Sequence, residues 1–309
     1  MALKDMKHKK SDRIAYVFFY IYYLLSRIFP LRTWLFIGRY LGLLLYFIDA
    51  HHRKIAIINL QLAFGKEKSG REIHAIAREH FRQLGMNAQE WVRLKGLTET
   101  GLQRILNNID VKGKEHILAA KKKNRSVILL GAHFGNWEYA HLYFANTINR
   151  LNFIVRKLDN ALLEQERTEY NKNFNVNILY KENNLRTALK NLKNGEDLVI
   201  FTDRKAGLRE GIPSQFFGVK SSTIPLVSAL VKKYRLPVVP MFITRCKDMI
   251  HHQIIFLPEL KLGEITDELI IQKGTQIQND TIEKIIRMYP DHWLWVHRKW
   301  KCYHPEIYK

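Results

Sequence analysis

Hydrophobic residues follow three patterns along the chain, and each pattern predicts a different part of the fold. The first fifty residues hold two nearly uncharged apolar runs, at 14–25 and 34–48. Residues 53–95 place apolar side chains at helical spacing, which predicts amphipathic helices. From residue 109 onward, short β-like runs alternate with helical stretches. Strands that alternate with helices are typical of an α/β domain with helices on both faces of its sheet.

The alternating region defines the expected elements of this domain. Strands are expected at 109–111, 126–131, 152–155, 177–179, 198–202, 238–244 and 252–257. Helices are expected at 136–147, 160–173, 183–194, 223–234 and 278–289. The sequence therefore predicts one α/β domain over residues 51–309, with a central, mostly parallel or mixed sheet flanked by helices. Residues 1–50 are expected to form membrane-associated helices that precede it.

The two N-terminal apolar runs are shorter than an ordinary spanning helix, which needs about 20 apolar residues. Their many tyrosines favour a position at the membrane interface. Basic residues precede the first run and follow the second, so both ends prefer the cytoplasmic side. We therefore expect a shallow hairpin or two interfacial helices, with one tilted spanning helix as the alternative. A pair of buried soluble helices and a secretory signal are the other interpretations, although no small-x-small cleavage site follows the first run.

Composition narrows the possible partners. Among 309 residues, 50 Lys and Arg face 29 Asp and Glu, a formal net charge of +21 that predicts an anionic partner. That partner would be a lipid-headgroup surface or a nucleic acid. Two cysteines, Cys246 and Cys302, exclude a disulfide framework and suit a reducing cytoplasm. The histidine pairs at 51–52 and 251–252 lack acidic or cysteine neighbours at ligand spacing, so we expect no metal and no cofactor.

The candidate chemistry lies in a glycine-rich turn after the buried run at 126–131. This turn holds His133, and the carboxyl ends of strands are where sites gather in open α/β sheets. Asn136 is a good N-cap, which places Glu138 in the first turn of the next helix. Gly135 would let the chain double back, so that the Glu138 carboxylate orients the His133 ring and leaves its other nitrogen as a general base.

The sequence offers no Ser or Cys nucleophile beside His133, so the substrate is expected to supply the attacking hydroxyl. Backbone amides of the turn from Gly135 and Asn136 to Glu138 would then stabilise the oxyanion of an acyl-transfer reaction. A hydrolase that activates water with the same pair is an alternative. A structural histidine, hydrogen-bonded at a strand end, is the simplest one.

Several segments resemble one family in the same order along the chain. The turn resembles the His-x4-Asp/Glu motif of the glycerolipid and lysophospholipid acyltransferase superfamily. More closely, the chain is similar to the lauroyl and myristoyl acyltransferases of lipid A biosynthesis in Gram-negative inner membranes. The segments that carry this resemblance are Val155-Arg156-Lys157-Leu158-Asp159-Asn160, Phe216-Phe217-Gly218 through Thr223, Val238-Val239-Pro240 and the closing stretch 289–300.

The resemblance implies a glycerolipid-acyltransferase-like domain on the cytoplasmic face of a bacterial inner membrane. The donor would be an acyl-acyl carrier protein or acyl-CoA, and the acceptor the hydroxyl of a 3-hydroxyacyl chain on an anionic, phosphorylated glucosamine lipid. His133 and Glu138 would be catalytic, and Arg156 a cation next to the site. Asp203, Arg204 and Thr223 would also contact substrate.

One departure from the family leaves the acceptor open. Thr202-Asp203-Arg204 stands where the family usually has Pro-Asp-Gln, so the acceptor could be another glycolipid or a lysophospholipid. A basic nucleic-acid-binding protein is the alternative from a different class. Its motivation is the C-terminal Trp293, Trp295 and Trp300 among basic residues, which could stack nucleobases, lie at a headgroup layer or pack in the core.

Overall fold

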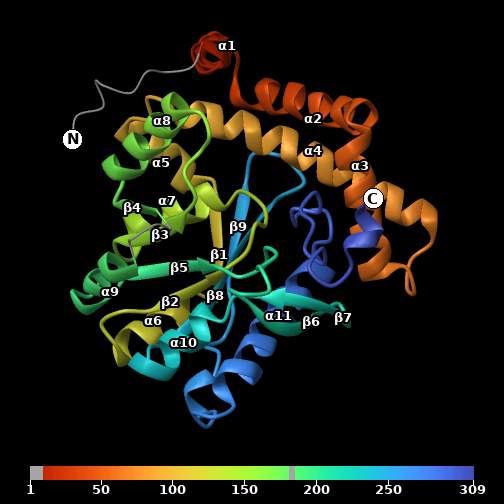
Figure 1. Cartoon of the computed structure of the whole chain (residues 1–309). Helices are drawn as coiled ribbons and strands as arrows, with labels where there is room; N and C mark the ends of the chain where they lie inside the picture. Colours follow the sequence, from red (N-terminus) through yellow and green to blue (C-terminus); the bar gives the residue numbers. More distant parts are fainter. Residues whose placement is uncertain (1–9, 181–184) are drawn as a thin grey trace.

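The computed structural model describes residues 10–180 and 185–309, and its N-terminal part is helical (Figure 1). The helices there are α1 (Lys10–Ile28), α2 (Leu31–Ile48), α3 (Ala50–Phe64), α4 (Gly70–Leu94) and α5 (Glu99–Asn107). Helix α3 ends at its C-cap Gly65. Ser69 is the N-cap of α4 and forms a capping box with Glu72. Helices α1 and α2 pack on α4, and α2 is the described helix that is long and apolar enough to cross a membrane by length and composition.

A seven-stranded mixed sheet forms the centre of the chain. Its strands are β1 (Ile109–Lys112), β2 (Ile128–Gly131), β3 (Leu151–Val155), β4 (Val176–Tyr180), β5 (Asp197–Phe201), β8 (Val238–Arg245) and β9 (His252–Phe256). They lie in the order β1-β9-β8-β2-β5-β3-β4, and every neighbouring pair is parallel except β8 and β9. All seven predicted strands are confirmed, within one or two residues at most ends, and so is the α/β class.

Helices cover both faces of this sheet. They are α6 (Lys114–Lys123), α7 (Trp137–Thr147), α8 (Ala161–Asn173), α9 (Leu185–Lys193), α10 (Leu226–Tyr234) and α11 (Ile270–Met288), with short 3-10 turns η2 (Leu262–Glu264) and η3 (Pro305–Tyr308). Alternate residues of β2 enter opposite cores, as strand geometry requires. Ile128 and Leu130 pack with α3, α4 and α9 to α11, whereas Val127 and Leu129 pack with α5 to α8.

The sequence prediction omitted two helices and one hairpin. Helices α5 and α6 were not expected. Lys121 lies in the last turn of α6 and pairs with buried Asp197 at 2.9 Å. Strands β6 (Ile212–Phe216) and β7 (Val219–Thr223) form a separate antiparallel hairpin. Phe217 and Gly218 at its tip have φ of 53° and 69°, which suits a tight hairpin turn.

The C-terminal tryptophans belong to the core. Trp293, Trp295 and Trp300 are 1%, 0% and 0% exposed. The packing interpretation is therefore confirmed, and the nucleobase-stacking and headgroup interpretations of these three rings are wrong. Residues 289–300 run along the carboxyl edge of the sheet, where Phe134 forms an isolated antiparallel bridge with Trp293.

Candidate active site

Sheet register brings His133 and Asp203 together. Strands β2 and β5 are parallel neighbours in which Gly131 pairs with Phe201. Each chain then continues two residues beyond this pair, so His133 and Asp203 lie at the same level past the sheet edge. The His133 ring Nδ1 lies 3.0 Å from Asp203 Oδ1, and the His133 backbone N–H donates to Oδ2 at 2.9 Å.

The Asp203 carboxylate is buried and fully engaged. It is 2% exposed, and its Oδ2 also accepts a hydrogen bond from the Trp293 indole at 2.9 Å. Burial favours its neutral form, but His133 and these hydrogen bonds hold the pKa of Asp203 well below its usual range. An ionised carboxylate only accepts, so His133 Nδ1 carries the proton and Nε2 is the free acceptor. The His133 side chain is 17% exposed, which leaves it reachable.

Glu138 has a different partner from the one expected. Its Oε2 accepts a hydrogen bond from the Tyr170 hydroxyl at 2.8 Å, which connects α7 to α8. Burial raises the pKa of Glu138, and the Tyr170 hydrogen bond only partly opposes this shift. The carboxylate described in contact with the His133 ring is that of Asp203, not that of Glu138. The expected His133–Glu138 pair is therefore wrong, because α7 directs Glu138 toward α8 and Asp203 occupies the place beside the ring.

The turn between His133 and α7 is held in one conformation. Gly135 has a φ of 58°, and a Cβ at this position would lie 1.9 Å from the Ile243 carbonyl oxygen. The Gly135 N–H donates to the His292 carbonyl at 2.9 Å, so the expected oxyanion role of this amide is wrong. Asn136 caps α7 through Tyr139 N–H. No partner is described for the amides of residues 136–138, as is normal at a helix start.

A buried polar network supports this turn from below. Asn87 and Glu90 of α4 contact it directly: Asn87 Nδ2 donates to the Gly135 carbonyl at 2.9 Å, and Asn136 Nδ2 donates to Glu90 at 2.7 Å. Arg245, at the end of β8, donates to both Glu90 oxygens at 2.6 and 2.5 Å. Although burial opposes ionisation, Arg245 holds the pKa of Glu90 below its usual range. The sequence analysis missed this network, because the residue pairs that bond in it are 46 to 155 positions apart.

Two further residues of the C-terminal segment complete the site. The His297 ring lies 5.3 Å from the His133 ring, and burial together with His133 lowers the pKa of His297 to about 4. Lys299 is 0% exposed, and burial lowers its pKa to about 8 despite the nearby Asp203. Its ammonium contacts the carbonyls of Thr202 and Arg204 at 3.4 and 3.5 Å, so it holds the chain on both sides of Asp203.

The remaining predicted residues lie at different distances from this centre. Arg204 is exposed next to Asp203, on the rim of the site. Arg156 follows β3 at the same sheet edge, but its side chain is 71% exposed and pairs with Asp159 at 2.6 Å, and no contact with His133 is described. Thr223 is buried, and its hydroxyl accepts hydrogen bonds from Ser214 and Lys299. The structure thus gives Thr223 an internal role, and its expected contact with substrate is not retained.

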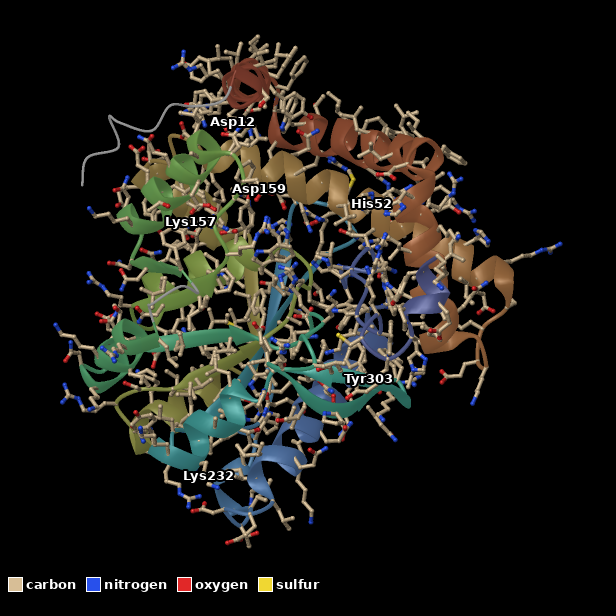
Figure 2. The ribbon with its side chains drawn as sticks, in the orientation of Figure 1. Asp12, His52, Lys157, Asp159, Lys232 and Tyr303 are labelled. Carbon is tan, nitrogen blue, oxygen red and sulfur yellow. The ribbon has the colours of Figure 1, made fainter. Side chains whose placement is uncertain are left out.

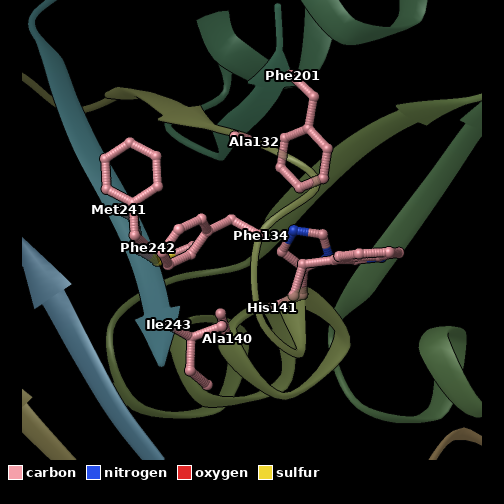
Figure 3. A pocket seen from close by; sticks show the side chains of 9 residues that line it. Ala132, Phe134, Ala140, His141, Phe201, Met241, Phe242 and Ile243 are labelled. Carbon is pink, nitrogen blue, oxygen red and sulfur yellow. The ribbon is translucent and has the colours of Figure 1, made fainter. Parts of the chain in front are cut away.

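A small cavity lies behind the His133 ring. His133 packs edge-on against Trp137 and Phe201, and these two side chains also line the cavity. Figure 3 shows His141 of α7 standing among the aromatic and aliphatic side chains of the wall. His141 is 1% exposed, no partner is described for either ring nitrogen, and burial lowers its pKa to about 3. In the described ranges, no group of three His, Cys, Asp or Glu residues could hold a metal ion.

Comparison with known proteins identifies the chain as an acyltransferase. A family model for the bacterial lipid A biosynthesis acyltransferases matches residues 4–302. This match spans nearly the whole chain, so the protein belongs to the bacterial lipid A biosynthesis acyltransferase family. The family resemblance of its motifs is thereby confirmed.

Individual relatives come from Escherichia coli (strain K12). A lipid A biosynthesis palmitoleoyltransferase is 26% identical over 279 residues, which are 88% of this chain and 86% of the relative. A lauroyltransferase is 28% identical over 255 residues, 80% of this chain and 78% of the relative. A myristoyltransferase is 22% identical over 263 residues, 84% and 77% respectively. These relatives differ in the acyl chain that their names give.

Proposed function

We propose that the protein transfers a fatty acyl chain from acyl-acyl carrier protein, or acyl-CoA, to a hydroxyl of a lipid A precursor, with His133 as the general base. The observation that carries this proposal is the pairing of His133 Nδ1 with the buried, ionised Asp203. This pairing fixes the ring and its tautomer, and it leaves Nε2 to take a proton.

The reaction begins when Nε2 of His133 removes the proton of the acceptor hydroxyl. The acceptor oxygen forms a bond to the thioester carbonyl carbon, and the resulting oxyanion lies at the free amides of residues 136–138. The intermediate then collapses, the C–S bond breaks, and the His133 imidazolium returns its proton to the leaving thiolate. The Asp203 carboxylate stabilises the imidazolium between these steps. No covalent acyl-enzyme is formed.

The other residues have supporting roles in this proposal. Glu138, next to the catalytic turn, is proposed to anchor α7 to α8 through its hydrogen bond with Tyr170. Arg204 on the rim and Arg156 on the β3 loop are proposed to contact phosphates of an anionic acceptor, because a guanidinium binds phosphate through two parallel hydrogen bonds. A phosphorylated glucosamine lipid with hydroxyacyl chains offers both the phosphates and the hydroxyl, so it is the proposed acceptor.

The proposed location is the cytoplasmic face of a bacterial inner membrane. The relatives act in lipid A biosynthesis by name, and the apolar side chains exposed on α1 and α2 favour a lipid environment. Acyl carrier protein and acyl-CoA are donors in the cytoplasm. The basic residues that flank the two N-terminal apolar runs favour the same side of the membrane.

The test is acyl transfer by the purified protein, measured by mass spectrometry of a hydroxyacylated, phosphorylated glucosamine lipid. Both acyl-acyl carrier protein and acyl-CoA are offered as donors. His133→Gln should lower the rate by about 10² to 10⁴-fold, the usual contribution of a positioned general base. His116→Gln, a partly exposed histidine on α6, is the matched control and should leave the rate unchanged.

Two outcomes would contradict the proposal. Transfer by His133→Gln at the rate of the unaltered protein would exclude His133 as the base. Thioester cleavage that proceeds equally without lipid would favour the hydrolase alternative.

A further inference from the structure

The exposed apolar side chains of the protein are concentrated on its first two helices. Twenty-two large hydrophobic residues are exposed in the described ranges, and sixteen of them lie between residues 14 and 48. In α2 they include Phe36, Tyr40, Leu44 and Phe47, which are 51% to 61% exposed along one side of the helix. Figure 1 shows α1 and α2 at one end of the molecule, with α2 running alongside α4.

The opposite side of α2 is joined to α4 by backbone contact. Gly38 and Gly42 face Gly85 of α4 so closely that a Cβ on Gly85 would lie 2.0 Å from the Gly38 carbonyl oxygen. A Cβ on Gly42 would lie 2.1 Å from the Phe81 carbonyl oxygen. Small residues at this spacing let two helices approach at their backbones. Helix α2 therefore cannot tilt away from α4 without losing this interface.

Hydrogen bonds also attach α1 and both ends of α2 to the rest of the protein. Arg93 of α4 donates to the carbonyls of Ser26 and Phe29, at 2.6 and 2.9 Å, and so fixes the junction of the two helices. At the other end of α2, Arg53 donates to the Tyr46 carbonyl at 2.7 Å. The Asn160 side chain donates to the Asp12 carbonyl at 3.0 Å, which attaches the start of α1 to the loop that carries Arg156.

Helix α4 belongs to the catalytic domain and is too polar to enter a membrane. Seven of its 25 residues are Arg or Glu. Its Glu90 pairs with Arg245 beneath the His133 turn, and its Arg82 pairs with Glu79 at 2.8 Å. If α2 crossed the hydrocarbon layer, α4 would have to cross beside it and bring these charges into lipid. Each such charge is costly there, so this arrangement is excluded.

We infer that α1 and α2 lie flat in one leaflet of a lipid bilayer, with the sixteen exposed apolar residues between positions 14 and 48 immersed, and that this part of the chain does not cross the membrane. The occupant of this face is an anionic lipid surface. Exposed Arg13, Arg27 and Arg32 flank the apolar side chains, and the formal net charge is +21.

This placement also sets the height of the Arg156 loop. Because Asn160 holds the Asp12 carbonyl, the loop lies beside the start of α1, and Figure 2 shows Asp12 and Asp159 close together at the same end of the molecule. With α1 in the interface, the Arg156 guanidinium stands at the level of the lipid phosphates. An acceptor lipid would thus meet Arg156 without leaving its leaflet.

Cysteine labelling in intact spheroplasts tests the placement. In a Cys246→Ser/Cys302→Ser background, Arg13→Cys and Arg32→Cys are treated from outside with a membrane-impermeant maleimide. Neither should react until the membrane is permeabilised with detergent, and Arg235→Cys, exposed on the catalytic domain, should behave in the same way. Reaction of either Arg13→Cys or Arg32→Cys from outside would show a crossing helix and overturn the inference.

A vesicle assay tests the occupant independently of the enzymatic reaction. Co-sedimentation with phosphatidylethanolamine and phosphatidylglycerol vesicles is compared for Phe36→Ser/Leu44→Ser/Phe47→Ser and for Leu118→Ser/Leu208→Ser/Met288→Ser. Both triple variants remove exposed apolar side chains of similar exposure, but the second lies off the proposed face. The first should bind at least about tenfold more weakly and the second normally, because binding scales with the apolar area immersed.

Unchanged vesicle binding by the first triple variant would overturn the inference. If binding is unchanged, and the unaltered protein forms a dimer on size-exclusion chromatography that the variant does not form, the face belongs to a second copy of the chain instead. Acyl transfer is not needed for either readout, so failure of the proposed reaction would leave this test intact.

Discussion

The His133 turn and the Arg156 loop follow strands of the same sheet edge, but their polar groups are held in different ways. At the turn, His133 and Gly135 are fixed by partners from three other segments, one of which is the buried Asp203. On the loop, Arg156 and its partner Asp159 are 71% and 92% exposed. Buried networks lose much when one member is removed, whereas exposed ion pairs contribute little to the fold. We therefore expect the turn to control the chemical step and the loop to control acceptor binding.

The largest effect is expected from the carboxylate that orients His133. Asp203→Asn keeps the size of the side chain but favours the wrong ring tautomer, and the comparable change in a serine protease triad lowers kcat by about 10⁴-fold. We expect Asp203→Asn to lower kcat by about 10² to 10⁴-fold with little change in KM. Steady-state kinetics with saturating donor measure both constants.

Glu138→Gln is the matched control for Asp203→Asn. Gln retains an oxygen that can accept from Tyr170, so this variant should lose less than about tenfold in kcat. A loss from Glu138→Gln as large as that from Asp203→Asn would restore Glu138 as a direct participant.

A second prediction concerns the rigidity of the turn. Gly135→Ala would require a positive φ, which costs about 1–2 kcal/mol for Ala, and would also push the chain away from the Ile243 carbonyl. A misplaced catalytic group commonly costs about 10²-fold in rate. We expect a loss of that size in kcat, measured in the same assay.

Gly218→Ala separates the two causes. Gly218 has a φ of 69° at the tip of the β6–β7 hairpin, and nothing lies within 4 Å of an added Cβ. It should show the conformational cost as a lower melting temperature, while kcat remains normal. Equal kcat values for the two alanine variants would contradict the proposed importance of the close approach at Gly135.

The fold of the sheet could be predicted from the sequence because each strand carries a local signal. A buried run such as 198–201 is apolar on both faces and is bounded by polar residues. The β6–β7 hairpin lacks such a signal, because Pro213, Ser214 and Gln215 do not read as a strand. Helix α6 ends in three lysines and reads as a polar loop.

Pairings within the site could be predicted only in part. His133 is a candidate because it follows an apolar run at a strand end, and Asp203 because of the family resemblance. Their contact depends on β2 and β5 being neighbours in register, and strand order is not a property of either segment. Glu138 was chosen as the partner because it is close in sequence. Lys299 showed no signal that distinguished it from the solvated lysines, since its burial arises from the packing of three segments.

The third prediction moves to the exposed loop. Arg156→Ala should raise the KM for a phosphorylated acceptor about tenfold and leave kcat within about twofold. A hydrogen bond to a charged group contributes about 1.5–3 kcal/mol, and solvent exposure of this guanidinium keeps its contribution near the lower end of that range. Arg235→Ala is the control, because Arg235 also forms an exposed ion pair, with Asp267 at 2.7 Å. Equal KM values for the two variants would show that general positive charge, and not the loop position, binds the acceptor.

The smallest expected effect comes from His141, a buried residue near the turn whose ring nitrogens have no described partner. His141 is buried among aromatic side chains with both ring nitrogens unpaired. An unsatisfied buried polar group costs about 1–3 kcal/mol, so His141→Phe should raise the unfolding free energy by an amount of that order at neutral pH. Thermal and urea unfolding of the detergent-solubilised protein measure this difference.

The pH dependence sharpens the same comparison. Burial lowers the pKa of His141 to about 3 in the folded chain, against about 6.5 when unfolded. The folded state therefore binds fewer protons than the unfolded state between these values. The stability that this neutral histidine preserves above about pH 6.5 is lost as the pH falls. The advantage of His141→Phe should thus be about 1.4 kcal/mol larger at about pH 5.5 than at about pH 7.5. A difference that does not change with pH would mean that His141 is protonated as readily in the folded chain as in the unfolded one.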